Sequence, residues 1–138
     1  MGWMDQGGGC LAGDPRGGLP VQCRADTKDH AAGRGAQLLV LPELCLTGYT
    51  CQDLFLQQSL IDQAKRALSE LAAFSHACSV LTIVGLPMQW EGKVYNCAAV
   101  VYRGKLLGVV PKTHLPNYGE FYERRHFMPA PQQNGRLA

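Results

Sequence analysis

From residue 37 onward, short apolar runs alternate with one longer amphipathic stretch. The run 37–41 is Gln-Leu-Leu-Val-Leu and is followed by Pro42, which predicts a short strand covered on both faces. Between Leu56 and Ser75, apolar residues recur at helical spacing while charged residues fall mostly outside their stripe, which predicts an amphipathic helix. The stripe consists of Leu60, Ala64, Ala67, Leu68 and Leu71.

The pattern after this helix indicates three further strands. A second apolar run, 79–86, is ended by a proline and predicts another buried strand. The runs 94–102 and 105–110 flank an Arg-Gly pair and predict a hairpin. An aromatic and charged loop, 112–127, follows. The order strand, helix, strand, hairpin favours an α/β layered fold.

Residues 1–32 show neither pattern. They are rich in glycine and contain Pro15 and Pro20, so no helical or alternating period emerges. The composition changes abruptly near Gly33. We therefore interpret 1–32 as an atypical segment, disordered or mistranslated from a misread frame or wrong start, and 33–138 as the part that folds.

Composition and charge narrow the classes of function. The chain has 138 residues and a net charge of +2, too small a charge to argue for nucleic acid or a membrane surface, and its apolar runs are too short to span a bilayer. Its start lacks the pattern of a signal peptide, and its six cysteines include no Cys-x-x-Cys pair. We expect a cytoplasmic protein with reduced cysteines, no metal site, no nucleic-acid partner and no membrane contact.

Two charged residues each follow an apolar strand directly. Glu43 follows the strand 37–41, and Lys112 follows the second hairpin strand. A carboxylate at the end of a strand can act as a general base, and a lysine there can stabilise an oxyanion. Taken singly, each is more often a solvated surface residue. Together, on strands expected to be neighbours, they need only a nucleophile to make an acyl-transfer site.

A family resemblance rests on four segments of the sequence. These are 42–49 (PELCLTGY), 53–55 (DLF), 95–99 (YNCAA) and 110–127 (VPKTHLPNYGEFYERRHF). In this order they resemble the nitrilase superfamily of carbon–nitrogen hydrolases, which uses a Glu-Lys-Cys triad in an αββα sandwich. More narrowly, they look like the glutamine amidohydrolase domain of bacterial glutamine-dependent NAD synthetases. The resemblance implies that this chain holds the first half of such a sandwich.

The resemblance also implies a role for each matching residue. Glu43 corresponds to the general base that takes the thiol proton, and Lys112 to the group that stabilises the tetrahedral intermediate. Glu123 corresponds to the residue that faces the α-ammonium group of glutamine. The further residues expected to bind glutamine or to shape its pocket are Tyr118, Phe121 and Tyr49.

The rest of the family's reaction depends on parts that this sequence does not contain. A cysteine attacks the glutamine amide, and the released ammonia passes to a synthetase domain that uses ATP and magnesium to amidate nicotinic acid adenine dinucleotide. In the family the nucleophilic cysteine lies after the lysine loop, and no cysteine follows Cys97 here. We therefore expect a catalytically inactive fragment with no cofactor of its own. The resemblance implies glutamine as substrate, the synthetase domain of the same chain as partner, and a homo-oligomeric full enzyme.

Two other functions remain open from the sequence. The chain could be a fragment of a different nitrilase-type amidase that acts on another small amide. It could also be a non-catalytic association module, because half a sandwich leaves a sheet edge and an apolar face uncovered.

Overall fold

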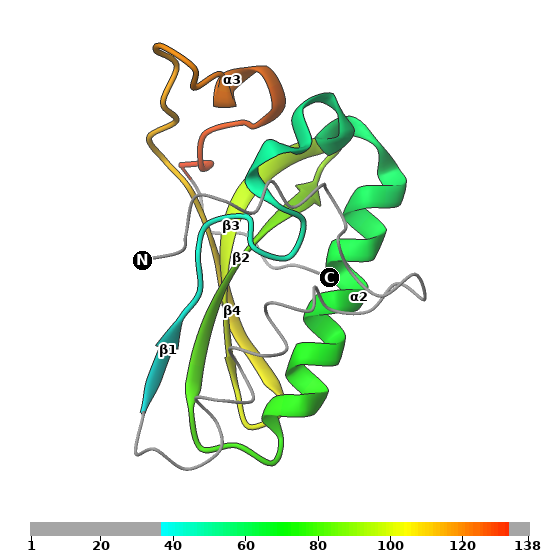
Figure 1. The fold of residues 1–138 in the computed structure, drawn as a ribbon, viewed down its shortest axis with the longest axis vertical. Helices are drawn as coiled ribbons and strands as arrows, with labels where there is room; N and C mark the ends of the chain where they lie inside the picture. The colour runs from blue at the N-terminus through cyan, green and yellow to red at the C-terminus, as the bar shows by residue number, and fades with distance from the viewer. Residues whose placement is uncertain (1–36, 133–138) are drawn as a thin grey trace.

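The computed structural model describes residues 37–132, which fold into one sheet and its covering helices. The elements in chain order are β1 (Leu38–Val40), the 3-10 helix η1 (Tyr49–Leu56), α2 (Gln58–Ser75), β2 (Leu81–Trp90), β3 (Lys93–Tyr102), β4 (Lys105–Pro111) and α3 (Glu123–His126). The four strands lie in the order β1-β2-β3-β4, with β1 parallel to β2 and the other pairs antiparallel. Helix α2 runs along the sheet, while η1 and α3 lie at one end of the molecule (Figure 1). The predicted α/β class is confirmed; the interpretation of residues 1–32 falls outside the described residues.

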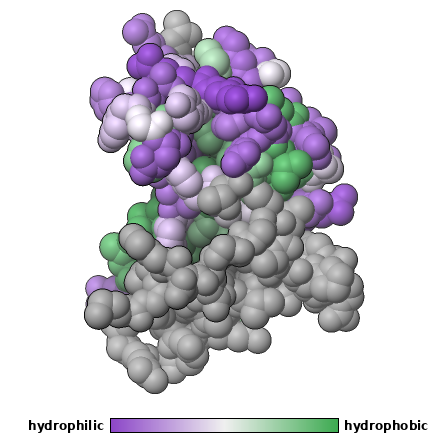
Figure 2. Space-filling view, turned by 45° about the horizontal axis from the view of Figure 1, so that its top comes forward, coloured by the Kyte–Doolittle hydropathy of each residue, from purple (hydrophilic) through white to green (hydrophobic). Residues whose placement is uncertain are grey.

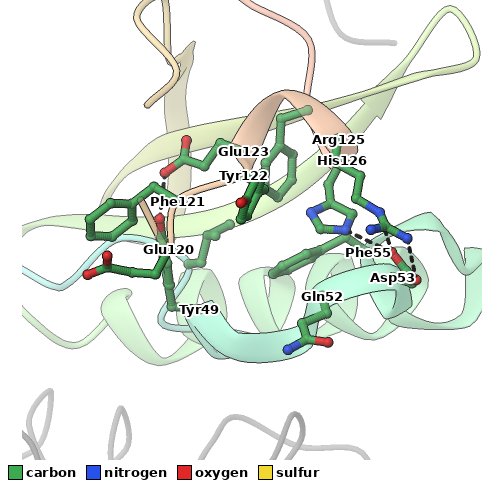
Figure 3. Close-up of a pocket in the computed structure, with 12 residues that line it drawn as sticks. Tyr49, Gln52, Asp53, Phe55, Glu120, Phe121, Tyr122, Glu123, Arg125 and His126 are labelled. Atoms are coloured by element: carbon green, nitrogen blue, oxygen red, sulfur yellow. Dashed lines mark hydrogen bonds and ion pairs between the residues drawn. The ribbon is translucent and has the colours of Figure 1, made fainter. Parts of the chain in front are cut away.

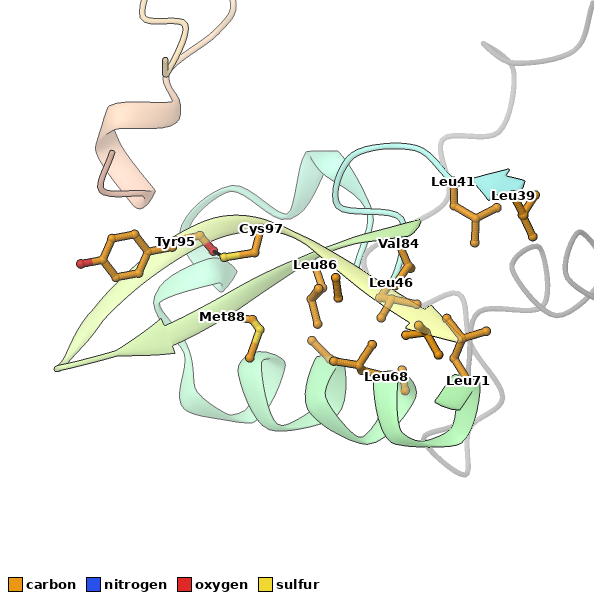
Figure 4. Packing of buried hydrophobic residues seen from close by; sticks show 14 of the residues in the cluster. Leu39, Leu41, Leu46, Leu68, Leu71, Val84, Leu86, Met88, Tyr95 and Cys97 are labelled. Carbon is orange, nitrogen blue, oxygen red and sulfur yellow. Dashed lines mark hydrogen bonds between the residues drawn. The ribbon is translucent and has the colours of Figure 1, made fainter. Parts of the chain in front are cut away.

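The core lies between α2 and one face of the sheet. Apolar side chains of the helix, including Leu68 and Leu71, meet Val84 and Leu86 of β2 in one buried cluster (Figure 4). The amphipathic stripe predicted from the sequence supplies this contact, because Leu60, Ala64, Ala67, Leu68 and Leu71 are all buried. Burial of large aliphatic side chains contributes about 1.5–3 kcal/mol each, so this helix–sheet interface holds the layers together.

The opposite face of the sheet is open at β1 and at the end of β4 in the described part of the chain. Leu39 of β1 is buried, but its neighbours Leu38 and Val40 are 54% and 61% exposed. Val110 of β4 is exposed in the same way. The prediction that the 37–41 strand is covered on both faces is therefore wrong for residues 37–132, because α2 is the single layer that packs against the sheet there.

Two element boundaries also differ from prediction. The segment 49–56, which lies between the predicted strand and the predicted helix, forms η1. Strand β2 continues through Pro87, where the sequence predicted its end, and pairs Pro87 with Asn96. The parallel partner β1 ends opposite Ile83. Beyond that point no strand of residues 37–132 pairs with this edge of β2, and a proline without an N–H group is tolerated at such an edge.

The end of the molecule that carries η1 and α3 presents mainly hydrophilic side chains, with apolar ones showing between them (Figure 2). No helix of residues 37–132 has the length and hydropathy needed to cross a bilayer. Within the same residues, no cluster of histidine, cysteine and acidic side chains is arranged to hold a metal ion. Cys78 and Cys97 are free thiols, whereas Cys51 is disulfide-bonded, so the expectation of reduced cysteines is wrong at that position.

Candidate active site

Glu43 lies in a tight turn that directly follows β1. The N–H group of Leu41 still donates to Ile83 O on β2 at 2.8 Å, and Gly48 N–H then closes the turn onto Leu44 O at 2.7 Å. Leu44 adopts a left-handed conformation with φ of 52°, and its side chain is fully buried. The turn is therefore anchored to the sheet and to the core, and this fixes the position of the Glu43 backbone.

The turn crosses β2 at Gly85, at backbone contact distance. Leu46 N–H donates to Gly85 O at 3.2 Å. A Cβ on Gly85 would lie 2.4–2.8 Å from backbone atoms of the turn, namely Leu44 N, Pro42 O and Glu43 Cα. Real Cβ atoms do not approach other atoms this closely, so glycine at position 85 is what lets the turn lie against the sheet.

Lys112 begins the loop that leaves β4. Its N–H group donates to Asn96 O on β3 at 2.8 Å, and its own carbonyl accepts from Ala130 N–H at 2.9 Å. Its Nζ lies 2.6 Å from Glu43 Oε1. The two residues therefore meet, although β1 and β4 are the outer strands and not the expected neighbours. The turn after β1 crosses over β2, and this crossing brings Glu43 toward Lys112.

Glu123 completes the charged cluster. It opens α3 and is 5% exposed. Both of its carboxylate oxygens accept from Lys112 Nζ, at 3.0 and 3.1 Å, and Oε1 also accepts from the Tyr49 hydroxyl at 2.8 Å. Asn96 Nδ2 donates to Glu43 Oε1. Two carboxylates and one ammonium group thus leave the cluster with one net negative charge.

The cluster shifts the pKa values of two of its members. Burial alone would lower the pKa of Lys112, but hydrogen bonds to Glu43 and Glu123 and their negative charges outweigh it and raise the pKa above its usual value. Partial burial, the hydrogen bond to Glu123 and the neighbouring carboxylates raise the pKa of Tyr49 well above its usual range. At neutral pH Lys112 therefore carries its charge and Tyr49 keeps its proton as a donor.

A cavity of about 350 Å³ opens beside the charged cluster. Tyr49 and Phe121 line it together with Glu123, and the Tyr49 and Phe121 rings meet edge to face with centroids 6.4 Å apart. Tyr118 touches the Phe121 ring at 5.9 Å but is 72% exposed and does not line the cavity. Figure 3 shows Tyr49, Phe121 and Glu120 grouped on one side of this space. The structure thus brings five of the six predicted site residues into one network, with Tyr118 at its rim.

The opposite wall of the cavity is an ion-pair brace that the sequence did not predict. Asp53 of η1 accepts from Arg125 Nη2 at 3.1 Å and lies 3.1 Å from His126 Nε2 (Figure 3). The His126 hydrogen bond, opposed in part by desolvation and assisted by the Arg125 charge, lowers the pKa of Asp53. Beneath the brace the Phe55 and Phe127 rings pack at 4.9 Å. The brace fixes α3, and with it Glu123, against η1.

Cys97 is poorly suited to be the nucleophile of this site. It lies in the apolar core cluster, and burial raises the pKa of its thiol to about 12. A thiol in such surroundings stays protonated and unreactive at neutral pH. Cys97 therefore acts as a small hydrophobic side chain of the core.

Asn96 was also missed as a site residue by sequence reasoning. It was noted only as part of the 95–99 motif, although it is a lone amide inside an otherwise apolar strand. A polar residue at such a position must find a buried partner, and that signal could have marked it. The Asp53 brace offered no comparable signal, because charged residues of an exposed loop and a short helix pair in many ways.

With this geometry in place, comparison with known proteins identifies the class. The sequence model of the carbon–nitrogen hydrolase family matches residues 14–137. The chain belongs to the carbon–nitrogen hydrolase family, and its sheet and helices form part of the nitrilase-like fold of that family.

Particular relatives narrow the likeness. The glutamine-dependent NAD(+) synthetase of Mycobacterium tuberculosis is 45% identical over 103 residues, which are 75% of this chain and 15% of that protein. The crystal structure of a glutamine-dependent NAD(+) synthetase from Cytophaga hutchinsonii matches with a TM-score of 0.74 at 36% identity, over 82% of this chain and 19% of that one. An amidase from Nesterenkonia sp. matches with a TM-score of 0.64 at 26% identity, over 85% and 44%. The chain thus spans less than a fifth of the length of the two synthetases it resembles.

Proposed function

We propose that this chain is the N-terminal part of the glutamine amidohydrolase domain of a cytoplasmic, glutamine-dependent NAD synthetase. The observation that carries the proposal is the contact of Lys112 Nζ with both Glu43 and Glu123. A carboxylate and a lysine in contact are the base and the oxyanion stabiliser that amide hydrolysis by a thiol requires. Relatives that are 45% and 42% identical to the chain carry the name of this enzyme.

In the proposed reaction, Glu43 takes the proton of a cysteine thiol, and the thiolate attacks the amide carbon of glutamine. The electron pair of the carbonyl moves onto its oxygen, which Lys112 stabilises. The C–N bond then breaks, Glu43 returns the proton to the leaving nitrogen, and ammonia departs. Water hydrolyses the remaining thioester to glutamate. The nucleophile is supplied from outside these 138 residues, because no cysteine follows Cys97 and Cys97 is buried.

The hydrogen bonds of Lys112 leave room for this role. An ammonium group has three N–H donors. One is used by Glu43 at 2.6 Å, and one is shared between the two oxygens of Glu123 at 3.0 and 3.1 Å. One donor remains for a developing oxyanion, and the pairing with two carboxylates keeps Lys112 charged before substrate binds.

The net negative charge of the cluster supports an amino-acid substrate. Glu123 and Tyr49 line the cavity beside Phe121, so a glutamine bound there presents its α-ammonium group to Glu123 and its apolar stem to the ring of Phe121, with Tyr118 at the rim. The ammonia then serves a synthetase domain that uses ATP and magnesium. That domain is a partner within the full enzyme, which we propose to be a homo-oligomer.

The test uses a chimera in which residues 37–132 replace the matching segment of the Mycobacterium tuberculosis synthetase. We expect Glu43→Gln to lower the glutamine-dependent rate at least about 100-fold, because a general base contributes about 10²–10⁴-fold. Lys112→Met should have a similar effect. NAD formation from added ammonium should persist in both variants, since it bypasses the amidase. Glu91→Gln and Lys65→Met, which change exposed residues, are the matched controls. Retention of the glutamine-dependent rate in Glu43→Gln refutes the proposal.

The isolated 138-residue chain should release no ammonia from glutamine. The reason is that the base and the lysine cannot form an acyl-enzyme without a thiol. Ammonia is measured after repeated purification, and steady turnover that survives purification contradicts the expectation.

The likeness to the Nesterenkonia amidase makes a nitrilase-type amidase with another substrate the second candidate. The two are separated in the chimera by comparing glutamine with propionamide, which lacks the α-ammonium group. Glutamine should also protect Lys112 from chemical modification, whereas propionamide should not. Equal use of both amides favours the second candidate.

A further inference from the structure

Asn96 joins the two charged residues of the candidate site through different groups. It lies in β3, paired with Pro87 of β2, and it is 2% exposed. Its backbone carbonyl accepts from Lys112 N–H at 2.8 Å. Its side-chain Nδ2 donates to Glu43 Oε1. A single buried residue in the sheet thus holds the backbone of the lysine and the side chain of the glutamate.

The position of Glu43 leaves much of its side chain in contact with solvent. It sits on a turn, and its side chain is 41% exposed. An exposed glutamate side chain samples several rotamers, and fixing it costs conformational entropy. Asn96 lies in the paired region of β2 and β3, so its amide is presented from a rigid element.

The two donors to Glu43 converge on the same oxygen. Asn96 Nδ2 and Lys112 Nζ both donate to Oε1. Within residues 37–132, Oε2 of Glu43 receives no hydrogen bond. The carboxylate is thereby held with one oxygen occupied and the other available to accept a proton.

We propose that Asn96 is a positioning residue for the general base: its amide holds Oε1 of Glu43, so that Oε2 is the oxygen that takes the thiol proton. The inference rests on the proposed function, because it assigns Asn96 its role through Glu43. An amide suits the task better than other donors. It is neutral at every pH, so it adds no charge to the cluster, and an N–H donor favours the ionised form of the carboxyl group that accepts it.

The test compares Asn96→Ala and Asn96→Asp in the chimera. Loss of the amide should lower kcat for glutamine about 10- to 100-fold, the factor that corresponds to one charge-assisted hydrogen bond. The KM for glutamine should change less than about twofold, because Asn96 is 2% exposed and acts through its hydrogen bond to Glu43. NAD formation from added ammonium should keep the rate of the parent chimera. Gln57→Glu, an amide-to-carboxyl change at an exposed position, is the control and should match the parent.

A pH profile separates positioning from a merely structural role. In Asn96→Asp the introduced carboxylate repels Glu43, but once protonated it can donate a hydrogen bond in place of the amide. The ratio of its glutamine-dependent kcat to that of the parent should therefore rise as the pH is lowered. Asn96→Ala, which has no group to protonate, should show a flat ratio.

The outcomes distinguish failure of the role proposed for Asn96 from failure of the proposed function. An unchanged kcat in Asn96→Ala, with Glu43→Gln inactive, overturns the role of Asn96 and leaves the proposed function standing. An active Glu43→Gln overturns the proposed function itself. If Asn96→Ala does not fold, the pH ratio of Asn96→Asp decides: a rise toward low pH supports positioning, and a flat ratio overturns it.

Discussion

Replacing Gly85 by alanine would place a methyl group where the turn carrying Glu43 rests on β2. The new Cβ would lie 2.4 Å from Leu44 N, and ordinary van der Waals contact begins at 3.4 Å. The obstructing atoms belong to the backbone, so no side-chain rotation relieves the contact. The turn must therefore withdraw from the sheet by about 1 Å, the difference needed to restore normal packing.

This displacement should affect stability and chemistry to different degrees. Overpacking of a well-packed site costs about 1–3 kcal/mol, which should lower the Tm of the chimera. A misplacement of about 1 Å at a reacting group costs about 100-fold in rate. Since Glu43 moves with the turn, we expect the glutamine-dependent rate of the chimera to fall about 100-fold while the protein remains folded.

The assay measures unfolding by heat and both activities of the chimera, driven by glutamine and by added ammonium. Gly108→Ala is the matched control, because a Cβ at Gly108 would meet nothing within 4 Å and the same glycine-to-alanine change is made in the same sheet. It should keep both activities and its Tm. If Gly85→Ala keeps the stability and the glutamine-dependent rate of the parent, the turn can shift without cost. The role assigned to Gly85 would then be refuted.

Two further predictions concern protonation. Glu123→Gln removes one of the two carboxylates that raise the pKa of Lys112, so that pKa should fall; NMR titration of Nζ measures it, and an unchanged titration contradicts the assigned contact. Because the folded-state pKa of Lys112 is raised, the stability it confers is present below the ordinary value of 10.5 and is lost as the pH rises through the folded-state pKa. For Asp53 the sign is opposite, because its folded-state pKa is lowered. The stability that Asp53 confers is present at pH values above its ordinary pKa of 3.8 and is lost as the pH falls through the folded-state pKa. Asp53→Asn should therefore lower the denaturation midpoint at neutral pH, and the difference in midpoint from the parent should narrow in acid. A difference in midpoint that does not change with pH would show that the ion pair is not its cause.

The helix and the two charged residues were within reach of the sequence for a physical reason. A helix that covers a sheet must repeat its apolar residues along one stripe, so the periodicity located α2 to within two residues at its start and matched its end at Ser75. Glu43 and Lys112 each follow an apolar run that forms a strand. The charged residue that follows such a run can be identified directly from the sequence. Their meeting required the three-dimensional path of the turn after β1, which no local pattern encodes.

Other features depended on partners that a local pattern does not contain. The end of β2 is set by its pairing with β3, and this pairing carries the strand past Pro87 to Trp90. The role of Asn96 depends on a turn about fifty residues earlier, as the sequence separation of 53 between Asn96 and Glu43 shows. The likeness of the 110–127 segment to a known family pointed to Glu123, whereas its hydrogen bond with Tyr49 spans 74 residues and could be found only in the fold.

The 69-residue separation between Glu43 and Lys112 has a consequence during synthesis. A ribosome adds roughly 5–20 residues per second, so Glu43 is made roughly 3–14 s before the lysine that pairs with it. During that interval Glu43 lacks the ammonium group of Lys112, and of the four strands that the structure describes, β4, which leads to Lys112, is made last. Formation of the Glu43–Lys112 ion pair therefore reports that these four strands have all been made, and a nascent chain halted before residue 112 would carry Glu43 without this ion pair.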